Sequence, residues 1–235
     1  MIATKFGWGT APGNPNAGGS GRLNVLRAVE DSLRRLGTDR IDLYWMHVWD
    51  RATPALELLL TFNDLIRAGK VRYFGLSNVP AWFVVQVAML ARQHGLQGPV
   101  AGQHWYSLVE RSIENEHLPA AHEFGLAIQP WAPLATGLLT GKYDRNDPKA
   151  AGGRLSGPNL MGEALFTERN WAIVDELKAV AAEAGRTPAQ VALAWVLGRP
   201  GVVAPVVGGG KVGRAAARDG GRARRELGVR APGAA

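Results

Sequence analysis

The chain has 235 residues, of which 46% are hydrophobic and 20% charged, and its formal net charge is +7. This length and composition are sufficient for a sizeable buried core in one domain of an ordinary globular protein. The absence of cysteine excludes disulfides and thiolate metal sites, and no apolar run approaches the ~18–20 residues of a membrane span.

The positive charge is concentrated at the end of the chain. Residues 208–235 contain seven basic and two acidic residues, which accounts for +5 of the +7. The remaining residues are close to neutral, so the charge does not indicate a nucleic-acid-binding surface on the folded part. The first residues show no basic segment followed by an apolar one. We therefore expect no signal peptide, a cytoplasmic location, and neither a membrane nor a nucleic-acid partner.

Short apolar strands alternate with amphipathic helices along most of the chain. The predicted strands are residues 1–7, 41–46, 71–76, 100–104, 126–130 and 202–207. The predicted helices are residues 23–36, 54–68, 82–94, 114–123, 166–184 and 188–197. Ser20 or Asn24 is the expected cap of the first helix, and Thr187-Pro188 is the expected start of the last. This alternation is typical of a parallel α/β fold.

One stretch, residues 36–50, carries the strongest candidate for a catalytic residue. It reads LGTDRIDLYWMHVWD, so a buried strand ends in His47, and Asp50 follows three residues later. In a (β/α)8 barrel the carboxyl ends of the strands build the active site, which makes His47 a candidate catalytic residue. The alternative is a core histidine that binds a backbone carbonyl.

Five motifs, in order, resemble those of the aldo-keto reductases. LGTDRIDLYWMH is similar to the family's fourth-strand signature, IATKFG at residues 2–7 to its third strand, and GKVRYFGLSN at residues 69–78 to its fifth. The match continues through QHWY at residues 103–106 and PWAPLATGLLTGKY at residues 130–143, as far as about residue 208. The resemblance implies an α/β fold, a (β/α)8 TIM barrel over residues 1–208.

The resemblance also implies roles for individual residues. In the family the lysine matching Lys5 lowers the pKa of a tyrosine that protonates the substrate carbonyl, and the residue matching His47 lies near the carbonyl oxygen. The residues that would bind NADP(H) are Ser77, Asn78 and Gln103 at the carboxamide, Tyr106 stacked on the nicotinamide, Trp131, Pro133, Leu134, Gly137 and Lys142 in a strap across the pyrophosphate, and Gly208 and Lys211 beyond it. The simpler alternatives are exposed lysines at positions 5 and 142, and a helix cap at Ser77-Asn78.

The family pattern differs at the start of the chain. Residues 1–7 match the third strand, so strands one and two, with the catalytic Asp and Tyr, are expected to be missing from this chain. We expect an incomplete reading frame upstream, or a fragment. The family's catalytic tetrad consists of Asp, Tyr, Lys and His, and only Lys5 and His47 can be placed in this chain. Tyr106 is assigned to stacking and Tyr44 lies within a strand, so neither replaces the missing tyrosine. Six of eight strands cannot close a barrel, and a missing general acid reduces the rate by ~10²–10⁴.

The pattern differs again after Gly208. The family usually has a turn there, followed by a helix whose Gln/Glu and Asn hold the adenosine 2′-phosphate. In this chain Lys211 is one position out of register, and Arg214 and Arg218 stand where Gln and Asn are expected. The Arg-, Ala- and Gly-rich residues 209–235 resemble a translation of G+C-rich DNA in a shifted frame. The alternative is a disordered basic tail that binds a polyanion.

The leading hypothesis is an NADP(H)-dependent oxidoreductase that reduces aldehyde or ketone carbonyls by hydride transfer without a metal. The first alternative is a non-catalytic NADP(H)-binding regulatory or structural protein like the potassium-channel β subunits, and the second is a fragment without function. Nucleic-acid binding through the tail is the least favoured hypothesis. Trp8, Trp49 and Trp105 indicate that a substrate pocket would be lined by aromatic side chains.

Overall fold

The computed structural model describes residues 1–149, 152–157 and 162–208. Two compact units make up the chain. The first unit contains Met1–His104 and Asn115–Ile128, and the second contains Trp105–Glu114 and the residues from Gln129 onward. The tail predicted for residues 209–235 lies outside the described residues, so the proposed domain boundary at residue 208 stays a prediction.

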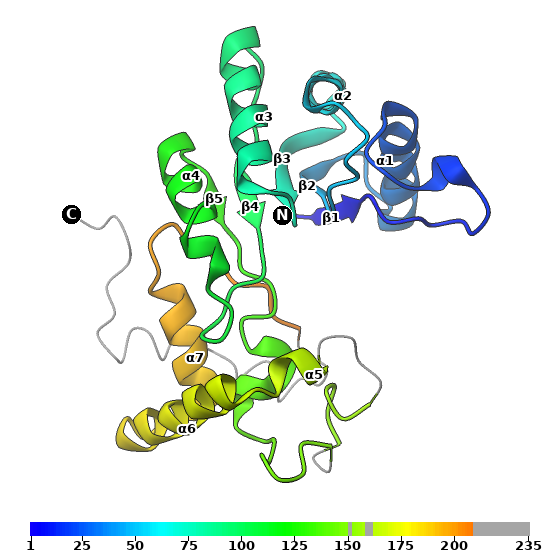
Figure 1. The fold of residues 1–235 in the computed structure, drawn as a ribbon. Helices are drawn as coiled ribbons and strands as arrows, with labels where there is room; N and C mark the ends of the chain where they lie inside the picture. The colour runs from blue at the N-terminus through cyan, green and yellow to red at the C-terminus, as the bar shows by residue number, and fades with distance from the viewer. Residues whose placement is uncertain (150–151, 158–161, 209–235) are drawn as a thin grey trace. The chain divides into compact units, whose positions relative to one another are not determined.

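The first unit consists of a parallel sheet and the helices that connect its strands (Figure 1). Its strands are β1 (Ala3–Phe6), β2 (Ile41–Met46), β3 (Val71–Ser77), β4 (Ala101–Gln103) and β5 (Ala127–Ile128). Its helices are η1 (Pro15–Ala17), α1 (Arg22–Leu36), α2 (Ala55–Arg67), α3 (Ala81–His94) and α4 (His117–Phe124). The sheet order is β1-β2-β3-β4-β5, and every pair is parallel. The predicted α/β class with parallel strands is confirmed.

Aromatic side chains fill the core between the sheet and its helices. Phe62 of α2 stacks on Phe74 of β3 with ring centroids 4.1 Å apart, and Phe6 of β1 lies 4.9 Å from Tyr44 of β2. Phe62, Phe74 and Tyr44 are all 0% exposed. Burying each such side chain contributes about 1.5–3 kcal/mol, so this cluster stabilises the packing of the strands against α2.

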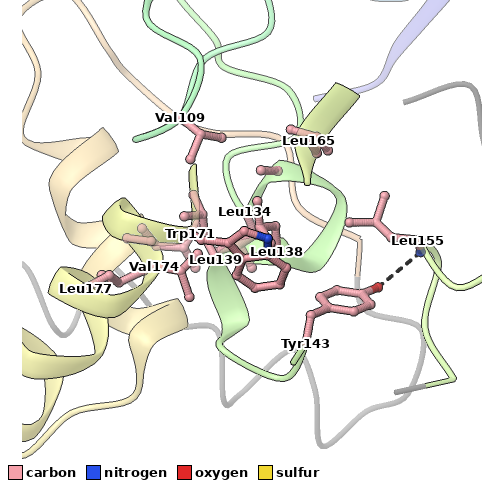
Figure 2. Close-up of a cluster of buried hydrophobic side chains, with 13 residues drawn as sticks. Val109, Leu134, Leu138, Leu139, Tyr143, Leu155, Leu165, Trp171, Val174 and Leu177 are labelled. Carbon is pink, nitrogen blue, oxygen red and sulfur yellow. Dashed lines mark hydrogen bonds between the residues drawn. The ribbon is translucent and has the colours of Figure 1, made fainter. Parts of the chain in front are cut away.

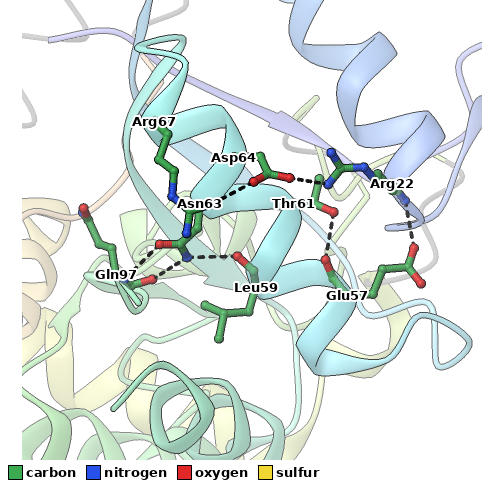
Figure 3. Close-up of polar contacts among 8 residues, drawn as sticks. All are labelled: Arg22, Glu57, Leu59, Thr61, Asn63, Asp64, Arg67 and Gln97. Carbon is green, nitrogen blue, oxygen red and sulfur yellow. Dashed lines mark hydrogen bonds and ion pairs between the residues drawn. The ribbon is translucent and has the colours of Figure 1, made fainter. Parts of the chain in front are cut away.

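A buried asparagine fixes α2 against the segment that follows α3 (Figure 3). The Asn63 amide nitrogen donates to the carbonyl oxygens of Leu59 at 2.9 Å and Gln97 at 3.0 Å, and Asn63 Oδ1 accepts from the Gln97 N–H at 2.9 Å. Because Asn63 is 5% exposed, these bonds replace the water contacts that its amide loses on folding. Asn63 therefore links α2 to the segment after α3 through hydrogen bonds within an otherwise apolar region.

The ends of α1 match the sequence prediction at one end only. Gly37 has φ of +63° and its N–H bonds the Arg34 carbonyl, as expected for a glycine that ends a helix. At the start, the N-cap is Gly21, and neither Ser20 nor Asn24 caps the helix, so that prediction is wrong. A side chain from another helix takes this role, because Glu57 Oε1 accepts from the Arg22 N–H at 3.1 Å (Figure 3).

The second unit is built from helices around a separate apolar core. Its elements are η2 (Ser112–Glu114), η3 (Ala135–Thr140), α5 (Gly162–Leu165), α6 (Glu168–Glu183) and α7 (Pro188–Leu197). Figure 2 shows its core, in which Leu138 and Leu139 of η3 meet Trp171, Val174 and Leu177 of α6. The predicted start of α7 is confirmed: Thr187 and Gln190 form a reciprocal capping box.

One predicted strand is not present. Residues 202–207 form no strand, although the Val206 N–H donates to the Pro130 carbonyl at 2.7 Å. Pro205 explains the difference, because it has no N–H to give to a ladder in the middle of the apolar run. Two other boundaries also moved: the strand expected at residues 126–130 is limited to Ala127–Ile128, and α4 begins at His117 rather than residue 114. None of the described helices is long and apolar enough to cross a membrane.

Candidate active site

The catalytic candidates and part of the predicted cofactor set lie together in the first unit. Lys5 lies in β1, His47 directly follows β2, Ser77 ends β3 and is followed by Asn78, and Gln103 ends β4. The register aligns these strand ends, since Lys5 pairs with Trp45 and Ser77 pairs with Gln103. Neighbouring parallel strands thus bring residues far apart in the sequence to one edge of the sheet, as the sequence predicts.

Hydrogen bonds connect these residues directly. Lys5 Nζ donates to Gln103 Oε1 across the strand ends. The Asn78 side-chain amide donates to the His47 carbonyl oxygen at 3.0 Å and to Ser77 Oγ at 3.1 Å. Asn78 has a positive φ of 51°, a conformation that asparagine tolerates better than most residues, and this turns its side chain toward His47. The Asn78 N–H also donates to the Gln103 carbonyl at 3.3 Å, so backbone and side-chain bonds together join these five residues, with His47 held through its backbone carbonyl.

Lys5 lies over an aromatic ring at the base of this cluster. Its Nζ is 5.3 Å from the ring centroid of Trp45, which is 1% exposed. Burial lowers the pKa of Lys5 from its ordinary value of 10.5. Gly75 of β3 makes room for the indole, because a Cβ there would lie 2.3 Å from Trp45 Cζ3. The sequence reasoning missed Gly75 and Trp45, although a glycine inside a strand is a known sign of close approach.

His47 is held in its neutral form. Partial burial lowers the pKa of His47 from its ordinary value of 6.5, and the positive charge of Lys5 lowers it further. A neutral imidazole carries one N–H donor and one acceptor nitrogen, so it can donate a hydrogen bond to an oxygen without adding a second positive charge. The Trp8 ring meets His47 edge-on at a centroid distance of 6.1 Å.

More aromatic side chains follow the ends of β2 and β3. Trp49 lies 5.2 Å from Trp82 and 6.0 Å from Phe83, and the Arg51 guanidinium lies 5.4 Å from the Trp49 ring. Trp82 is 54% exposed, so part of this aromatic group is open to solvent. Trp8 and Trp49, two of the residues expected to line a substrate pocket, thus both lie in the first unit, and the pocket itself stays a prediction. Trp105, by contrast, belongs to the second unit and stacks on Trp131 at 5.5 Å.

The predicted strap lies in the second unit. Pro133 and Leu134 are buried, and five residues have positive φ values: Ala132, Ala135, Thr136, Gly137 and Gly141. Thr140 Oγ donates to the Gly137 carbonyl at 2.7 Å and closes this sharp turn. Four N–H groups of the strap, those of Ala135, Gly137, Leu139 and Gly141, donate to carbonyl oxygens of the strap itself. The strap is therefore a tightly closed turn, and its role at a pyrophosphate stays a prediction.

Lys142 follows the strap at the edge of a polar pocket. Its Nζ lies 4.8 Å from the Tyr143 ring, and Tyr143 OH accepts from the Leu155 N–H at 3.1 Å (Figure 2). A Cβ at Gly153 would lie 2.2 Å from Lys142 Nζ, so the backbone of residue 153 passes directly over the ammonium group. The pocket has a volume of about 470 Å³ and is lined by three cations, Lys142, Arg145 and Lys178, and by two carboxylates, Asp144 and Asp175. Arg145 pairs with Asp175 at 3.0 Å, so Lys142 and Lys178 supply most of the excess positive charge.

Tyr106 is placed differently from the stacking role that the resemblance implies. Its ring is 0% exposed and packs 5.4 Å from Trp195, and its OH donates to Glu114 Oε1 at 2.7 Å. Burial raises the pKa of Tyr106, and the bond to the Glu114 carboxylate raises it further. In this structure the ring offers no solvent-exposed face, so stacking on a nicotinamide requires a rearrangement and stays a prediction. Gly208 is exposed, and Lys211 lies outside the described residues.

The donor set can be compared with the chemistry of NADP(H). A carboxamide requires a mixture of donors and acceptors, which Ser77, Asn78 and Gln103 supply side by side. Phosphates require cations, which Lys142 and the neighbouring Lys178 supply in the second unit. The chemistry of the first set fits a carboxamide, and that of the two lysines fits a phosphate. Among the described residues, no cluster of His, Asp and Glu could hold a metal ion.

Comparison with known proteins adds the family. Residues 1–218 match the profile of the Aldo/keto reductase family. An uncharacterized oxidoreductase of Bacillus subtilis is 38% identical over 83% of this chain and 59% of its own length. An aryl-alcohol dehydrogenase of Pestalotiopsis microspora is 36% identical over 90% of the chain and 54% of its own length. A putative voltage-gated potassium channel subunit beta of Schizosaccharomyces pombe is 33% identical over 90% of the chain and 62% of its own length. The family predicted from the motifs is confirmed, and the chain spans little more than half the length of these relatives.

Proposed function

We propose that this chain, which belongs to the aldo/keto reductase family, forms part of a site that reduces aldehyde or ketone carbonyls with NADP(H). The observation that supports the proposal is the cluster of Lys5, His47, Ser77, Asn78 and Gln103 at the ends of four adjacent parallel strands. Residues with unrelated structural roles have no reason to converge at one edge of the sheet, whereas residues that bind one polar reacting group must do so.

In this proposal the cofactor is held at two places. Ser77, Asn78 and Gln103 bind the carboxamide and so fix which face of the nicotinamide points toward His47. Gln103 Oε1 accepts from Lys5, so the same side chain links the lysine to the residues proposed for the carboxamide. The strap and Lys142 bind the phosphates. When bound, NADPH supplies the hydride.

Lys5 and His47 act on the substrate carbonyl. Reduction moves negative charge onto the carbonyl oxygen, and a preorganised cation and N–H donor stabilise that charge most where burial excludes water. His47 donates the hydrogen bond and Lys5 supplies the charge. The resemblance assigns the proton donor to a tyrosine that no residue of this chain matches, so the proposal assigns no proton donor here. A cytosolic location and a small-molecule carbonyl or alcohol substrate are part of the same proposal.

Cofactor binding and turnover test the proposal separately. NADPH should quench the tryptophan fluorescence of the 235-residue chain saturably, and 4-nitrobenzaldehyde should be reduced at a rate above background. Lys5→Met and His47→Gln should each lower kcat/KM by about 10²–10³ while NADPH binding changes little. Quenching that rises without saturation would reject the cofactor, and turnover equal in the wild-type chain and both variants would reject the site.

A second candidate function is supported by the names of several relatives. Besides the fission-yeast protein, probable voltage-gated potassium channel β subunits of rice and Arabidopsis thaliana are each 32% identical to this chain. In this alternative the chain binds NADP(H) as a regulatory or structural subunit without appreciable turnover. Saturable NADPH binding together with no measurable aldehyde reduction would favour it over the reductase.

A further inference from the structure

The loops that follow β1 and β2 are joined by one carboxylate. Asp50 Oδ2 accepts from the Ser20 N–H at 2.6 Å and from Thr53 Oγ1 at 2.7 Å. Asp50 Oδ1 accepts from the N–H groups of Thr53 at 3.0 Å and Ala52 at 3.1 Å. Three of these donors lie in the loop of Asp50 itself. The fourth, Ser20, comes from the other loop, 30 residues away in the sequence.

The Ser20 end of that loop is tied back to the end of β1. The Gly19 N–H donates to the Gly7 carbonyl at 2.8 Å, and the Thr10 N–H donates to the Ala17 carbonyl at 2.9 Å. The two arms lie in close contact, because a Cβ at Gly18 would be 3.2 Å from the Gly9 backbone. Holding Ser20 therefore also holds Gly7 and the residues next to it.

Gly7 leads directly to Trp8, whose ring lies edge-on beside His47. A Cβ at Gly7 would lie 3.3 Å from Val48 Cγ1 and 3.7 Å from the backbone nitrogen of His47, so the two loops touch at this point. Trp8 is 62% exposed, and apart from its edge-on contact with His47 it has little packing of its own. Its position must come from the backbone on which it sits.

We propose that Asp50 is a positioning residue: it latches residues 7–20 onto the loop after β2 and so holds Trp8 beside His47 as one wall of the carbonyl site. This inference rests on the proposed function for its catalytic meaning, but its geometry does not depend on turnover. Burial alone would raise the pKa of Asp50, and the hydrogen bonds from Thr53, Ser20 and Ala52 outweigh it and hold the pKa below its ordinary value. The latch is therefore charged at neutral pH.

A purely local role for Asp50 gives different expectations. If Asp50 served only to start α2, its bonds to Ala52 and Thr53 would be the important ones. Gly19→Ala leaves those bonds intact but places a methyl group 3.2 Å from Asp50 Oδ2, at a residue with φ of +76°. Thr53→Val does the reverse, since it removes the hydroxyl donor and leaves the Ser20 bond. The pair separates the latch from the helix start.

The readouts are the pKa of His47, by NMR of the full chain labelled with ¹⁵N-histidine, and hydrogen exchange of residues 8–20 by mass spectrometry. His47→Gln identifies the His47 signal. Asp50→Ala and Gly19→Ala should raise the pKa of His47 toward its ordinary value, because the imidazole gains solvent, and should speed exchange of residues 8–20 about tenfold or more. Trp8→Ala should raise the pKa of His47 without speeding the exchange of residues 8–20. Thr53→Val should change neither the pKa nor the exchange.

The direction of the change in the pKa of His47 distinguishes loop movement from the simple loss of a negative charge. Removing a carboxylate without moving the loop takes away negative charge and would lower the pKa of His47, while Lys5, the cation that acts on His47, is the same in every variant. A fall or no change with Asp50→Ala, or no effect of Gly19→Ala, overturns the proposal. If Asp50→Ala does not fold, Gly19→Ala and Trp8→Ala decide the result alone.

Kinetics then separate this inference from the proposed function. In an active enzyme, Asp50→Ala should raise the KM for the aldehyde about 10-fold or more with a smaller change in NADPH affinity, because the wall contacts substrate rather than cofactor. If the expected pKa shifts and faster exchange are observed but neither the wild-type chain nor any variant reduces aldehyde, the latch is supported and the reductase proposal fails. If aldehyde is reduced but the pKa and exchange of the variants do not change as expected, the reductase proposal stands and the latch fails.

Discussion

Replacing Gly75 by alanine is expected to displace the indole that underlies Lys5. Gly75 lies in the middle of β3, paired with Trp45 on one side and Ala101 on the other. An added methyl group would lie 2.3 Å from Trp45 Cζ3 and 2.9 Å from the Ala101 carbonyl oxygen. Neither neighbour can move freely, because Trp45 is 1% exposed and the Ala101 oxygen belongs to the strand backbone.

The expected loss of stability follows from these contacts. Overpacking a filled core costs about 1–3 kcal/mol, and the reduced freedom of the unfolded alanine chain offsets about 0.4–1 kcal/mol. Since the methyl group is crowded from two sides, we expect a net loss of about 2 kcal/mol. In a Trp45→Leu background the ring clash is absent, so the same change should cost at least about 1 kcal/mol less.

Urea unfolding followed by far-UV circular dichroism measures both effects. Gly9→Ala is the matched control in the same unit, because a methyl group there meets no atom within 4 Å, and its effect should stay within about 0.5 kcal/mol. If Gly75→Ala proves as stable as Gly9→Ala, or if the Trp45→Leu background changes nothing, then close packing of the indole is not the reason for this glycine.

Three further changes test other parts of the structure. Burial, together with the nearby His117, lowers the pKa of His104 from 6.5 to about 3. Between these two values the unfolded chain binds a proton that the folded chain does not, so acidification from pH 7 to pH 5 should lower the free energy of unfolding by about 2 kcal/mol. The His104→Gln variant should show a flatter dependence of stability on pH. Asn63→Ala should destabilise by about 1–3 kcal/mol in urea unfolding, because it leaves the partly buried Gln97 N–H and carbonyl without their partner, and an unchanged midpoint would contradict a stabilising role of these bonds. Thr187→Ala should cost about 1 kcal/mol through loss of the α7 capping box, and Thr187→Ser should restore most of it.

The sequence predicts the positions of the catalytic candidates because strand geometry is local. Each candidate lies at the end of a short apolar run, and consecutive parallel strands must bring their carboxyl ends to one edge of the sheet. Lys5, His47, Ser77 and Gln103 needed no further information to be placed together. Their pairing in detail, such as the bond from Lys5 to Gln103, depends on side-chain packing that no local pattern contains.

The errors and omissions arise where a second segment decides the result. Residues 202–207 contain enough valine for a strand, but Pro205 interrupts the ladder, and Val203, Val206 and Val207 remain exposed. Tyr106 was expected to face a cofactor, whereas Trp195, nearly ninety positions later, packs against its ring. Asp50 stood out only as a neighbour of His47. Its spacing to Thr53 indicates the bonds within its own loop, but its partner Ser20 is a tertiary contact.

The charges around His47 fit together in one consistent arrangement. Two adjacent cations would repel, and the structure avoids this because burial, together with the positive charge of Lys5, lowers the pKa of His47 and favours the neutral imidazole near pH 7. A free carboxylate three residues from His47 would compete with the substrate oxygen for Lys5. Asp50 does not, because four hydrogen bonds from Ser20, Ala52 and Thr53 satisfy it within the loops that it joins. In the proposed reduction, the bonds that position Trp8 thus also keep Asp50 from competing for Lys5, whose charge can then stabilise the oxygen that gains negative charge.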